Sequence, residues 1–314
     1  MAYTPLRIST IKPDRDLSFD LYIFYKERFL KYLDLGKCLN NDQLAKLKTQ
    51  KIAKFYITDS HEPAYQQYLD EILNEAVNSD TMNVDEKVNV AEGACSTAVE
   101  RMQKDPGSRS AYKMTENAAK SLRQIVSKNP EALKKIFGKK AKDSDIIIKH
   151  SLNVSALSTK LAELIGGFSE KDLDDLSTAG LIHDLGITKL NKDDIILFEK
   201  PKDKLTMEDK RVYKLHPKDS ADMLAEKPYI NAEIIGLVLN HEEVLSGDGP
   251  QRKKQLSPLE EILSIVNMYD KRVQTTKKEP SEVMKDIMLE ELGNYNLELI
   301  NKFKSLLKQE GMIG

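Results

Sequence analysis

Four histidines and one aspartate have the residue types and spacing to support metal chemistry. The chain of 314 residues contains five histidines, and all but His61 lie in one segment: His150, His183, His216 and His241. Asp184 follows His183 directly, between apolar residues in AGLIHDLGITKL (179–190). Imidazole and carboxylate groups together suit iron, manganese or zinc. Because Cys38 and Cys95 are the only cysteines and form no CxxC pair, a thiolate zinc site is not indicated.

Each of the four histidines is expected on the apolar face of a helix, because apolar residues recur three and four positions away from it. His150 aligns with Ile147 and Val154, and His183 aligns with Leu176 and Gly180. The segments 209–224 and 231–243 repeat the pattern around His216 and His241. A fifth helix is expected to place four residues on one stripe: Leu263, Val266, Asn267 and Asp270.

Convergence of these faces favours a metal site over ordinary core histidines. An unpartnered buried polar group costs on the order of 1–3 kcal/mol, and a buried carboxylate costs more unless it is paired or bound to a cation. A carboxylate adjacent to a histidine ligand, as Asp184 is, can bridge two ions. Two ions about 3.5–4 Å apart activate hydroxide for attack on phosphorus.

These residues resemble the HD superfamily of metal-dependent phosphohydrolases, and within it the HD-GYP family, which hydrolyses cyclic di-GMP. The resemblance covers roughly residues 143–300. The family's first His matches His150, its HD pair matches His183-Asp184, and its His-Pro matches His216-Pro217. The motif HHExxDGxGYP falls on NHEEVLSGDGP (240–250), and the two later Asp residues fall on Asn267 and Asp270.

The match to the family motifs has several departures. The first His of HHE is Asn240, the Asp-Gly is Leu245-Ser246, and the Tyr is Gly249. The Lys that follows HDxG in the family is Ile187, with Lys189 nearby, and the first of the two later Asp residues is Asn267. These departures put catalysis in greater doubt than metal binding.

The resemblance implies a role for each matched residue. His150 and His183 would bind one ion with Asn267 nearby, His216 and His241 would bind the other, and Asp184 would bridge the two. The ions would be iron, with manganese as the alternative, and a bridging hydroxide would attack cyclic di-GMP. Asp270 would handle a proton or support a ligand, and Glu242 would orient a ligand or cap a helix.

Three alternatives to a cyclic di-GMP phosphodiesterase stay open. A degenerate relative would bind metal and a cyclic dinucleotide and signal without hydrolysis. Another HD phosphohydrolase would act on a different nucleotide. A helical scaffold without metal would need none of the four retained histidines.

The segment SGDGPQRKKQ (246–255) contains three basic residues shortly after His241: Arg252, Lys253 and Lys254. One interpretation is a mobile flap whose cations meet substrate phosphates. The other is a solvated surface loop, which is the usual role of a charge run.

The whole chain is expected to be mainly α-helical in three parts. Residues 1–75 predict a small α+β regulatory domain, with strands at 20–25 and 53–58 and a helix between them. Residues 76–142 predict a helical connector, interrupted at Pro106-Gly107. Residues 143–314 predict an all-helical metal-binding domain.

Composition excludes some classes of partner. The net charge is −2 with 31% charged residues, whereas duplex nucleic-acid binders usually carry a basic excess. No apolar run is long enough to span a bilayer, and the segment MAYTPLRISTIKPDRD (1–16) has no apolar core of the kind a secretory signal needs. We therefore expect a cytoplasmic protein whose partners are neither duplex nucleic acid nor a membrane. The resemblance to the HD-GYP family implies a cyclic dinucleotide as its ligand. The N-terminal region would mediate either a homodimer or contact with a signalling protein.

Overall fold

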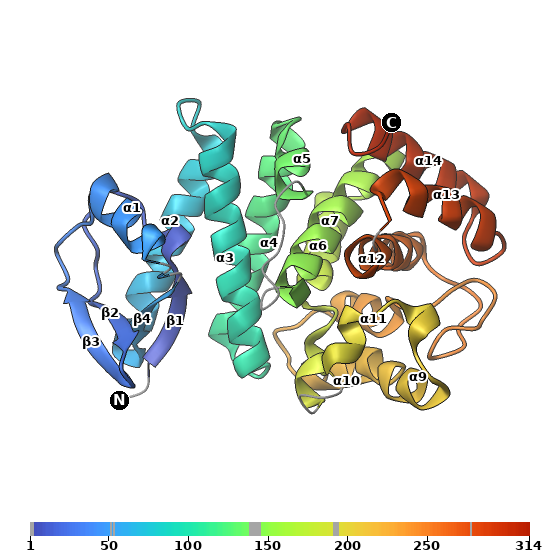
Figure 1. The fold of residues 1–314 in the computed structure, drawn as a ribbon, viewed down its shortest axis with the longest axis horizontal. Helices are drawn as coiled ribbons and strands as arrows, with labels where there is room; N and C mark the ends of the chain where they lie inside the picture. Colours follow the sequence, from blue (N-terminus) through green and yellow to red (C-terminus); the bar gives the residue numbers. More distant parts are fainter. Residues whose placement is uncertain (1–2, 51, 53, 138–145, 191–194, 277) are drawn as a thin grey trace.

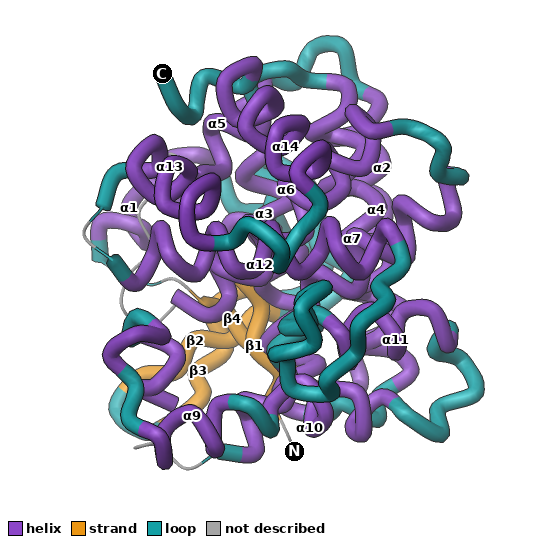
Figure 2. Tube along the Cα trace, turned by 90° about the vertical axis from the view of Figure 1, so that its right-hand side faces the viewer, coloured by secondary structure: helices purple, strands orange, loops and turns teal. Residues whose placement is uncertain are grey.

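A computed structural model describes residues 3–50, 52, 54–137, 146–190, 195–276 and 278–314. Figure 1 shows a small sheet at one end, helices in the middle, and a larger group of helices at the other end. In Figure 2 the strands form one small layer within an otherwise helical molecule. The prediction of a mainly α fold with a small α+β N-terminal part is confirmed.

The N-terminal sheet has four antiparallel strands in the order β1-β4-β2-β3. The two predicted strands are confirmed as β2 (Leu21–Tyr25) and β4 (Lys54–Thr58), with α1 (Asn41–Thr49) between them. Sequence analysis did not anticipate β1 (Tyr3–Arg7) and β3 (Arg28–Leu33). Strands β2 and β3 form a hairpin through Lys26 and Glu27, whose φ angles are 47° and 61°. Asn-Gly or Asp-Gly normally marks such a turn, so this one carries no sequence signal.

Four helices follow the sheet and form the centre of the molecule (Figure 1). They are α2 (Glu62–Asn78), α3 (Val84–Lys104), α4 (Arg109–Lys128) and α5 (Ala132–Phe137). The predicted break at Pro106-Gly107 falls between α3 and α4. The side chains of Asn83 and Ser108 accept hydrogen bonds from backbone N–H groups in the first turns of α3 and α4, which satisfies donors that helix starts leave unpaired.

Helices and connecting loops make up the described residues of the C-terminal part, apart from an isolated β-bridge between Leu292 and Tyr295. Its longer helices are α6 (Ile146–Ile165), α7 (Glu170–Ile182), α11 (Ala232–Asn240), α12 (Pro258–Thr275), α13 (Pro280–Glu290) and α14 (Leu297–Gln309). The short 3₁₀ segments are η4 (Leu185–Lys189), η5 (Ile196–Glu199) and η6 (Lys202–Lys204).

Residues 209–224 form two helices, and the prediction of one continuous helix there is wrong. The chain forms α9 (Met207–Tyr213) and then α10 (His216–Leu224). Pro217 lies in the first turn of α10. Proline lacks the N–H that a continuous helix would use, and its ring clashes with the carbonyl four residues earlier, so Pro217 is tolerated only in the first turn of a new helix.

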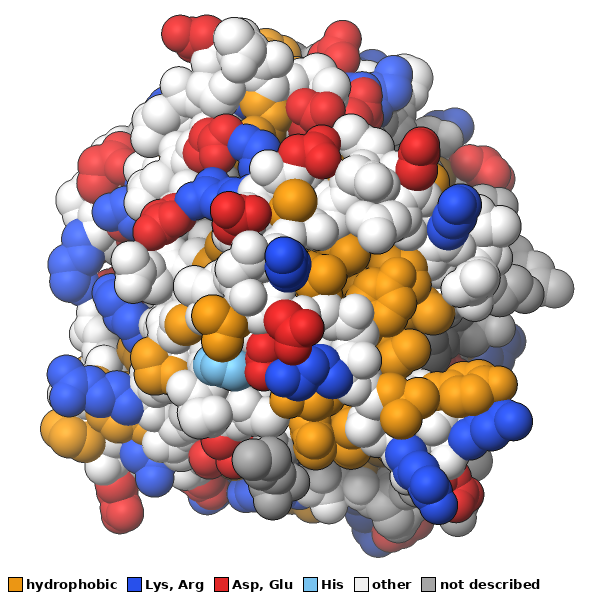
Figure 3. Space-filling model, turned by 90° about the vertical axis from the view of Figure 1, so that its left-hand side faces the viewer, with side chains coloured by type: hydrophobic (Ala, Val, Ile, Leu, Met, Phe, Trp, Pro, Cys, Tyr) orange, Lys and Arg blue, Asp and Glu red, His pale blue; other side chains and the backbone are white. Residues whose placement is uncertain are grey.

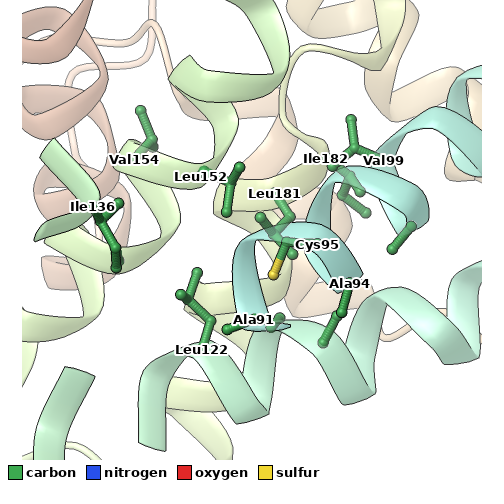
Figure 4. Packing of buried hydrophobic residues seen from close by; sticks show 14 of the residues in the cluster. Ala91, Ala94, Cys95, Val99, Leu122, Ile136, Leu152, Val154, Leu181 and Ile182 are labelled. Atoms are coloured by element: carbon green, nitrogen blue, oxygen red, sulfur yellow. The ribbon is translucent and has the colours of Figure 1, made fainter. Parts of the chain in front are cut away.

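The apolar core runs without interruption from the sheet to the C-terminal helices. Figure 4 shows where α3 and α4 pack against α6 and α7, with Leu122, Leu152 and Leu181 directed into one interface. Cys95 is fully buried there, and burial raises the pKa of its thiol. The helices described as a connector therefore pack directly on the helices that carry the first two histidines.

The helices α6 and α7 approach each other closely at Gly180. A Cβ atom at this position would lie 2.7 Å from Ser155 Cα and 2.9 Å from Ser155 N. Glycine is therefore needed for the two helix backbones to meet at this depth, three residues before His183.

The face of the sheet near β3 carries exposed hydrophobic side chains (Figure 3). They include Phe24 (52% exposed), Tyr25 (56%) and Leu35 (57%). The ring of Phe29 stacks on Tyr3 with centroids 4.0 Å apart. Whether this region contacts a second copy or another protein stays a prediction, as do the two boundaries between the three predicted parts. Among the described residues, no helix combines the length and apolar character required to cross a membrane.

We predict that Gly180→Ala lowers the free energy of unfolding by about 1–3 kcal/mol, because the added methyl group overpacks a backbone contact. Gly236→Ala is the matched control, since a Cβ at that helical position meets no atom within 4 Å. It should raise the free energy of unfolding by about 0.5–1 kcal/mol, because alanine loses less conformational entropy than glycine. Urea denaturation of both variants measures the difference, and equal stability would refute the packing argument.

Candidate metal centre

Five helices bring the predicted ligands together. His150 lies within α6, His183 and Asp184 directly follow α7, His216 begins α10, His241 directly follows α11, and Asn267 lies within α12. All of these side chains are buried. His183 and His241 occupy the C-terminal caps of their helices, so each ring projects from a helix end toward its neighbours.

Each imidazole is held through its Nδ1 atom. Three Nδ1–H groups donate to backbone carbonyls in the preceding turn: His183 to Gly180 (2.9 Å), His216 to Tyr213 (2.6 Å) and His241 to Val238 (2.6 Å). The His150 Nδ1–H group donates to the carboxylate of Asp270 (2.7 Å). Because carbonyls and carboxylates only accept, these contacts fix the tautomer and leave a lone pair on every Nε2.

The four Nε2 atoms converge in two pairs on Asp184. Its Oδ2 atom lies 3.4 Å from Nε2 of His183 and 3.7 Å from Nε2 of His150. Its Oδ1 atom lies 3.1 Å from Nε2 of His216 and 3.4 Å from Nε2 of His241. One carboxylate therefore serves both histidine pairs, one oxygen to each, and the ligand atoms within each group lie within 4.8 Å of one another.

The Nε2 atoms within each histidine pair face each other. Those of His216 and His241 are 2.9 Å apart, and those of His150 and His183 are 3.2 Å apart. Two lone pairs cannot hydrogen-bond to each other, and acceptors facing each other in a core are unfavourable. A bound divalent metal would resolve this conflict, and the set of nitrogen and carboxylate oxygen donors fits such ions.

Asn267 presents a carbonyl oxygen to the first pair. Its Oδ1 atom lies 2.8 Å from Nε2 of His150. Its Nδ2 group donates to the Glu242 carboxylate (3.0 Å) and to the His241 carbonyl (3.3 Å). Because both of those partners are acceptors, the orientation of the amide is determined. Asn267 therefore directs an amide oxygen toward the first histidine pair, and Glu242 orients this amide.

Asp270 lies behind His150, fully buried, and is absent from the residues that line the cavities described below. Besides accepting from His150, it accepts hydrogen bonds from Asn153 Nδ2 (2.8 Å) and Gln274 Nε2 (2.6 Å). This placement fits a carboxylate that positions a ligand and raises its basicity. Of the two predicted roles for Asp270, it favours ligand support over proton handling.

The charges of the centre match its ligand chemistry. Burial is the main cause that lowers the pKa of His241 to about 4, so this ring is neutral, as a ligand must be. Burial alone would raise the pKa of Asp184, but His183, His216 and His241 hold it well below its usual value. Burial would lower the pKa of His183, but the Asp184 charge raises it.

A cavity of about 810 Å³ opens beside His241 and Asn267. Its wall includes Glu242, which accepts a hydrogen bond from the Tyr213 hydroxyl (2.9 Å) and pairs with Lys202. Lys202, Lys271 and the burial of Glu242 were not anticipated from sequence, because a lysine or glutamate beside a helix end is usually solvated. A small second hollow is lined by His150, Asp184 and other residues, and Lys271 and Thr275 line both.

The basic segment 252–254 lies apart from this cavity. Arg252 and Lys254 are exposed, and Lys253 pairs with Glu260 (2.6 Å). None of the three is among the residues that line the cavity, so the structure does not bring them to the metal centre. Their role in substrate binding stays a prediction.

Glu243 anchors this loop and was also missed. Its carboxylate accepts hydrogen bonds from the backbone N–H groups of Gln251 (2.5 Å) and Lys253 (2.7 Å). A Cβ at Gly249 would lie 2.7 Å from both Cα and Cδ of Glu243. Glycine therefore replaces the motif tyrosine at a position where Glu243 occupies the adjacent space.

Comparison with known proteins agrees with this geometry. Residues 115–297 match the HD domain family. A segment of 148 residues is 30% identical to "Cyclic di-GMP phosphodiesterase PA4108" of Pseudomonas aeruginosa and covers 46% of this chain and 34% of that protein. The chain thus spans only about a third of that relative. A solved structure, "Bd1817, a HDG"Y"P protein from Bdellovibrio bacteriovorus", matches with a TM-score of 0.77 and 25% identity over 98% of this chain and 100% of that one.

The fold and site together define an HD-type helical domain, in which a His-Asp pair and three further histidines share one centre. Since the family match covers more than half of its residues, the chain belongs to the HD domain family. The two similar proteins support the resemblance to the HD-GYP family that the motifs indicated. The match begins at residue 115, within α4, and so includes part of the predicted connector.

We predict that Asp270→Asn lowers metal affinity by about 10–100-fold, because the His150 Nδ1–H group loses its carboxylate partner. Competition with a chelator of known affinity measures the change. Asp222→Asn is the control, since Asp222 is on the exposed side of α10 and pairs with Lys218. Equal affinity in the two variants would show that Asp270 does not support the ligand.

Proposed function

We propose that this chain is a metal-dependent phosphodiesterase that hydrolyses cyclic di-GMP or a related cyclic dinucleotide. One observation carries the proposal: four imidazole Nε2 atoms approach the two oxygens of Asp184 in two pairs. A carboxylate with this arrangement is suited to bridge two ions, as required for two-metal hydrolysis of phosphodiesters. The printed name of the Pseudomonas aeruginosa relative supports the choice of substrate.

We propose iron as the metal, with manganese as the alternative. His150, His183 and Asn267 would hold one ion, His216 and His241 the other, and Asp184 would bridge them. The donors are nitrogen and oxygen atoms without a thiolate, which suits both metals. When bound, the ions supply Lewis acidity and lower the pKa of water so that it can attack phosphorus.

The side chains around the ions would bind and orient the substrate. The cavity of about 810 Å³ lies in the size range of small-molecule sites, which is roughly 300–1,000 Å³. Its wall carries five basic residues, which make it suited to an anionic substrate: Lys202, Lys204, Lys271, Arg272 and Lys278. Of these, Lys271 is the one that we expect to meet a phosphate group. Asp270 and Glu242 would fix the orientation of His150 and Asn267.

A second candidate is a protein that binds metal and a cyclic dinucleotide and signals without cleavage. The replacements at Ile187, Gly249 and Asn267 favour it, because each removes a polar or charged group that the resembled family carries. Hydrolysis of another nucleotide is the remaining enzymatic alternative. A panel of cyclic dinucleotides, linear dinucleotides and phosphomonoesters separates these possibilities.

We predict that the full chain, purified without chelators, contains about two metal ions. It should cleave cyclic di-GMP when loaded with iron or manganese. His183→Ala and Asp184→Asn should lose most of the metal, and their turnover should fall by about 10²–10³-fold or more, since metal activation contributes several kcal/mol. Elemental analysis and a chromatographic cleavage assay measure both effects.

His61→Ala is the control, because this fifth histidine lies in the N-terminal part beside Asp20 and Thr58. Its metal content and turnover should equal those of the unmodified chain. Metal binding without cleavage of any substrate in the panel would favour the signalling candidate. A chain that binds no metal would refute both candidates.

A further inference from the structure

Lys271 is a buried cation without an anionic partner at the wall of the cavity. The residue is 6% exposed. Among the residues that the structure describes, none forms a hydrogen bond or an ion pair with its ammonium group. Its near contacts are two aromatic faces, with Nζ 4.3 Å from the ring centroid of Phe198 and 5.1 Å from that of Tyr213. Cation–π contacts recover only part of the hydration that a buried ammonium group loses.

This lack of a partner separates Lys271 from the other basic residues of the cavity wall. Each of the other four is paired with a carboxylate. The pairs are Lys202–Glu242, Lys204–Asp203, Arg272–Glu290 and Lys278–Asp286. The charge of Lys271 alone is therefore available to an anion that enters the cavity.

The position of Lys271 is next to the metal centre. It lines the large cavity together with His241 and Asn267, and it lines the small hollow together with His150 and Asp184. Three carboxylates of the centre already have partners: Asp184 and Asp270 lie against histidines, and Glu242 pairs with Lys202. Metal ions bound to Asp184 would neutralise more of its charge. Lys271 would then have less negative charge near it, which favours binding of an anion.

The ammonium group of Lys271 lies beside the apolar cluster that contains Ile187. Ile187 is buried in an apolar cluster with Phe198 and Tyr213, and the Lys271 ammonium group lies on the same two rings. The positive charge beside this cluster therefore comes from Lys271 in α12, whereas η4 contributes the apolar side chain of Ile187.

We propose that the ammonium group of Lys271 binds a phosphate oxygen of the substrate beside the metal centre. The inference rests on the proposed function in one respect, that the cavity receives a phosphate ester. In this proposal Lys271 binds the substrate and does not transfer a proton.

The test compares Lys271→Met, Lys271→Arg and Lys204→Met in the full, metal-loaded chain. Methionine keeps the length of the side chain and removes the charge, and arginine keeps the charge. Lys204→Met is the matched control, because Lys204 is on the same wall but is 73% exposed and paired with Asp203. Binding of inorganic phosphate is measured by calorimetry, and the KM and kcat for cyclic di-GMP are measured in parallel.

Lys271→Met should weaken phosphate binding by about tenfold or more, as expected for loss of a charge-assisted hydrogen bond. It should raise KM while metal content is unchanged and Tm stays at or above that of the unmodified chain. Lys271→Arg should retain most of the binding, and Lys204→Met should bind phosphate as the unmodified chain does.

Several results would overturn the assignment. One is unchanged phosphate affinity in Lys271→Met. Another is an equal loss of phosphate affinity in Lys271→Met and Lys271→Arg, accompanied by lower metal content or a lower Tm. The third is a lack of phosphate binding by the unmodified chain. A chain that binds phosphate through Lys271 but cleaves no cyclic di-GMP would refute the proposed function and support this inference. If the unmodified chain cleaves cyclic di-GMP and Lys271→Met does so with the same KM and kcat, the proposed function is supported and this inference is refuted.

Discussion

The structure depends on one electrostatic constraint, the convergence of four imidazole lone pairs on a single buried carboxylate. No hydrophobic contact can compensate for acceptors that face one another in a core. The fold fixes every Nδ1 atom with a carbonyl or carboxylate, so the rings cannot turn away from Asp184. The close crossing of α6 and α7 at Gly180 serves the same arrangement, because it sets the depth at which His183 meets His150.

The replacement of Asp by Asn at 267 shows how charge is redistributed around this centre. The amide keeps an oxygen toward His150 and turns its N–H groups toward Glu242 and the His241 carbonyl. Burial would raise the pKa of Glu242, but Lys202 and the nearby histidines hold it well below its usual value. Residue 267 therefore carries no negative charge, but the carboxylate of Glu242 beside it does. The Tyr213 hydroxyl and Lys202 stabilise that carboxylate.

Helical periodicity was sufficient to anticipate the histidine stripes, Asn267 and Asp270, because apolar neighbours mark the buried face of each helix. It could not anticipate features that depend on tertiary contacts. The turn at Lys26 and Glu27 has left-handed backbone without glycine or asparagine, so β3 carried no signal. Lys271 resembles a solvated helix residue until Phe198 and Tyr213 are placed over it. Arg252 and Lys254 resembled substrate contacts, but their loop donates backbone hydrogen bonds to Glu243, and neither residue lines the cavity.

The contact between Glu243 and Gly249 limits which residues position 249 can accept. Any side chain at 249 would meet the backbone and carboxylate of Glu243, and that carboxylate accepts hydrogen bonds from the N–H groups of Gln251 and Lys253. A tyrosine in place of Gly249 would therefore collide with Glu243 before it could reach the cavity. Glu243 would have to move or change to make room, and its hydrogen bonds to the loop would then be lost. The effects of substitutions at 243 and 249 are therefore coupled.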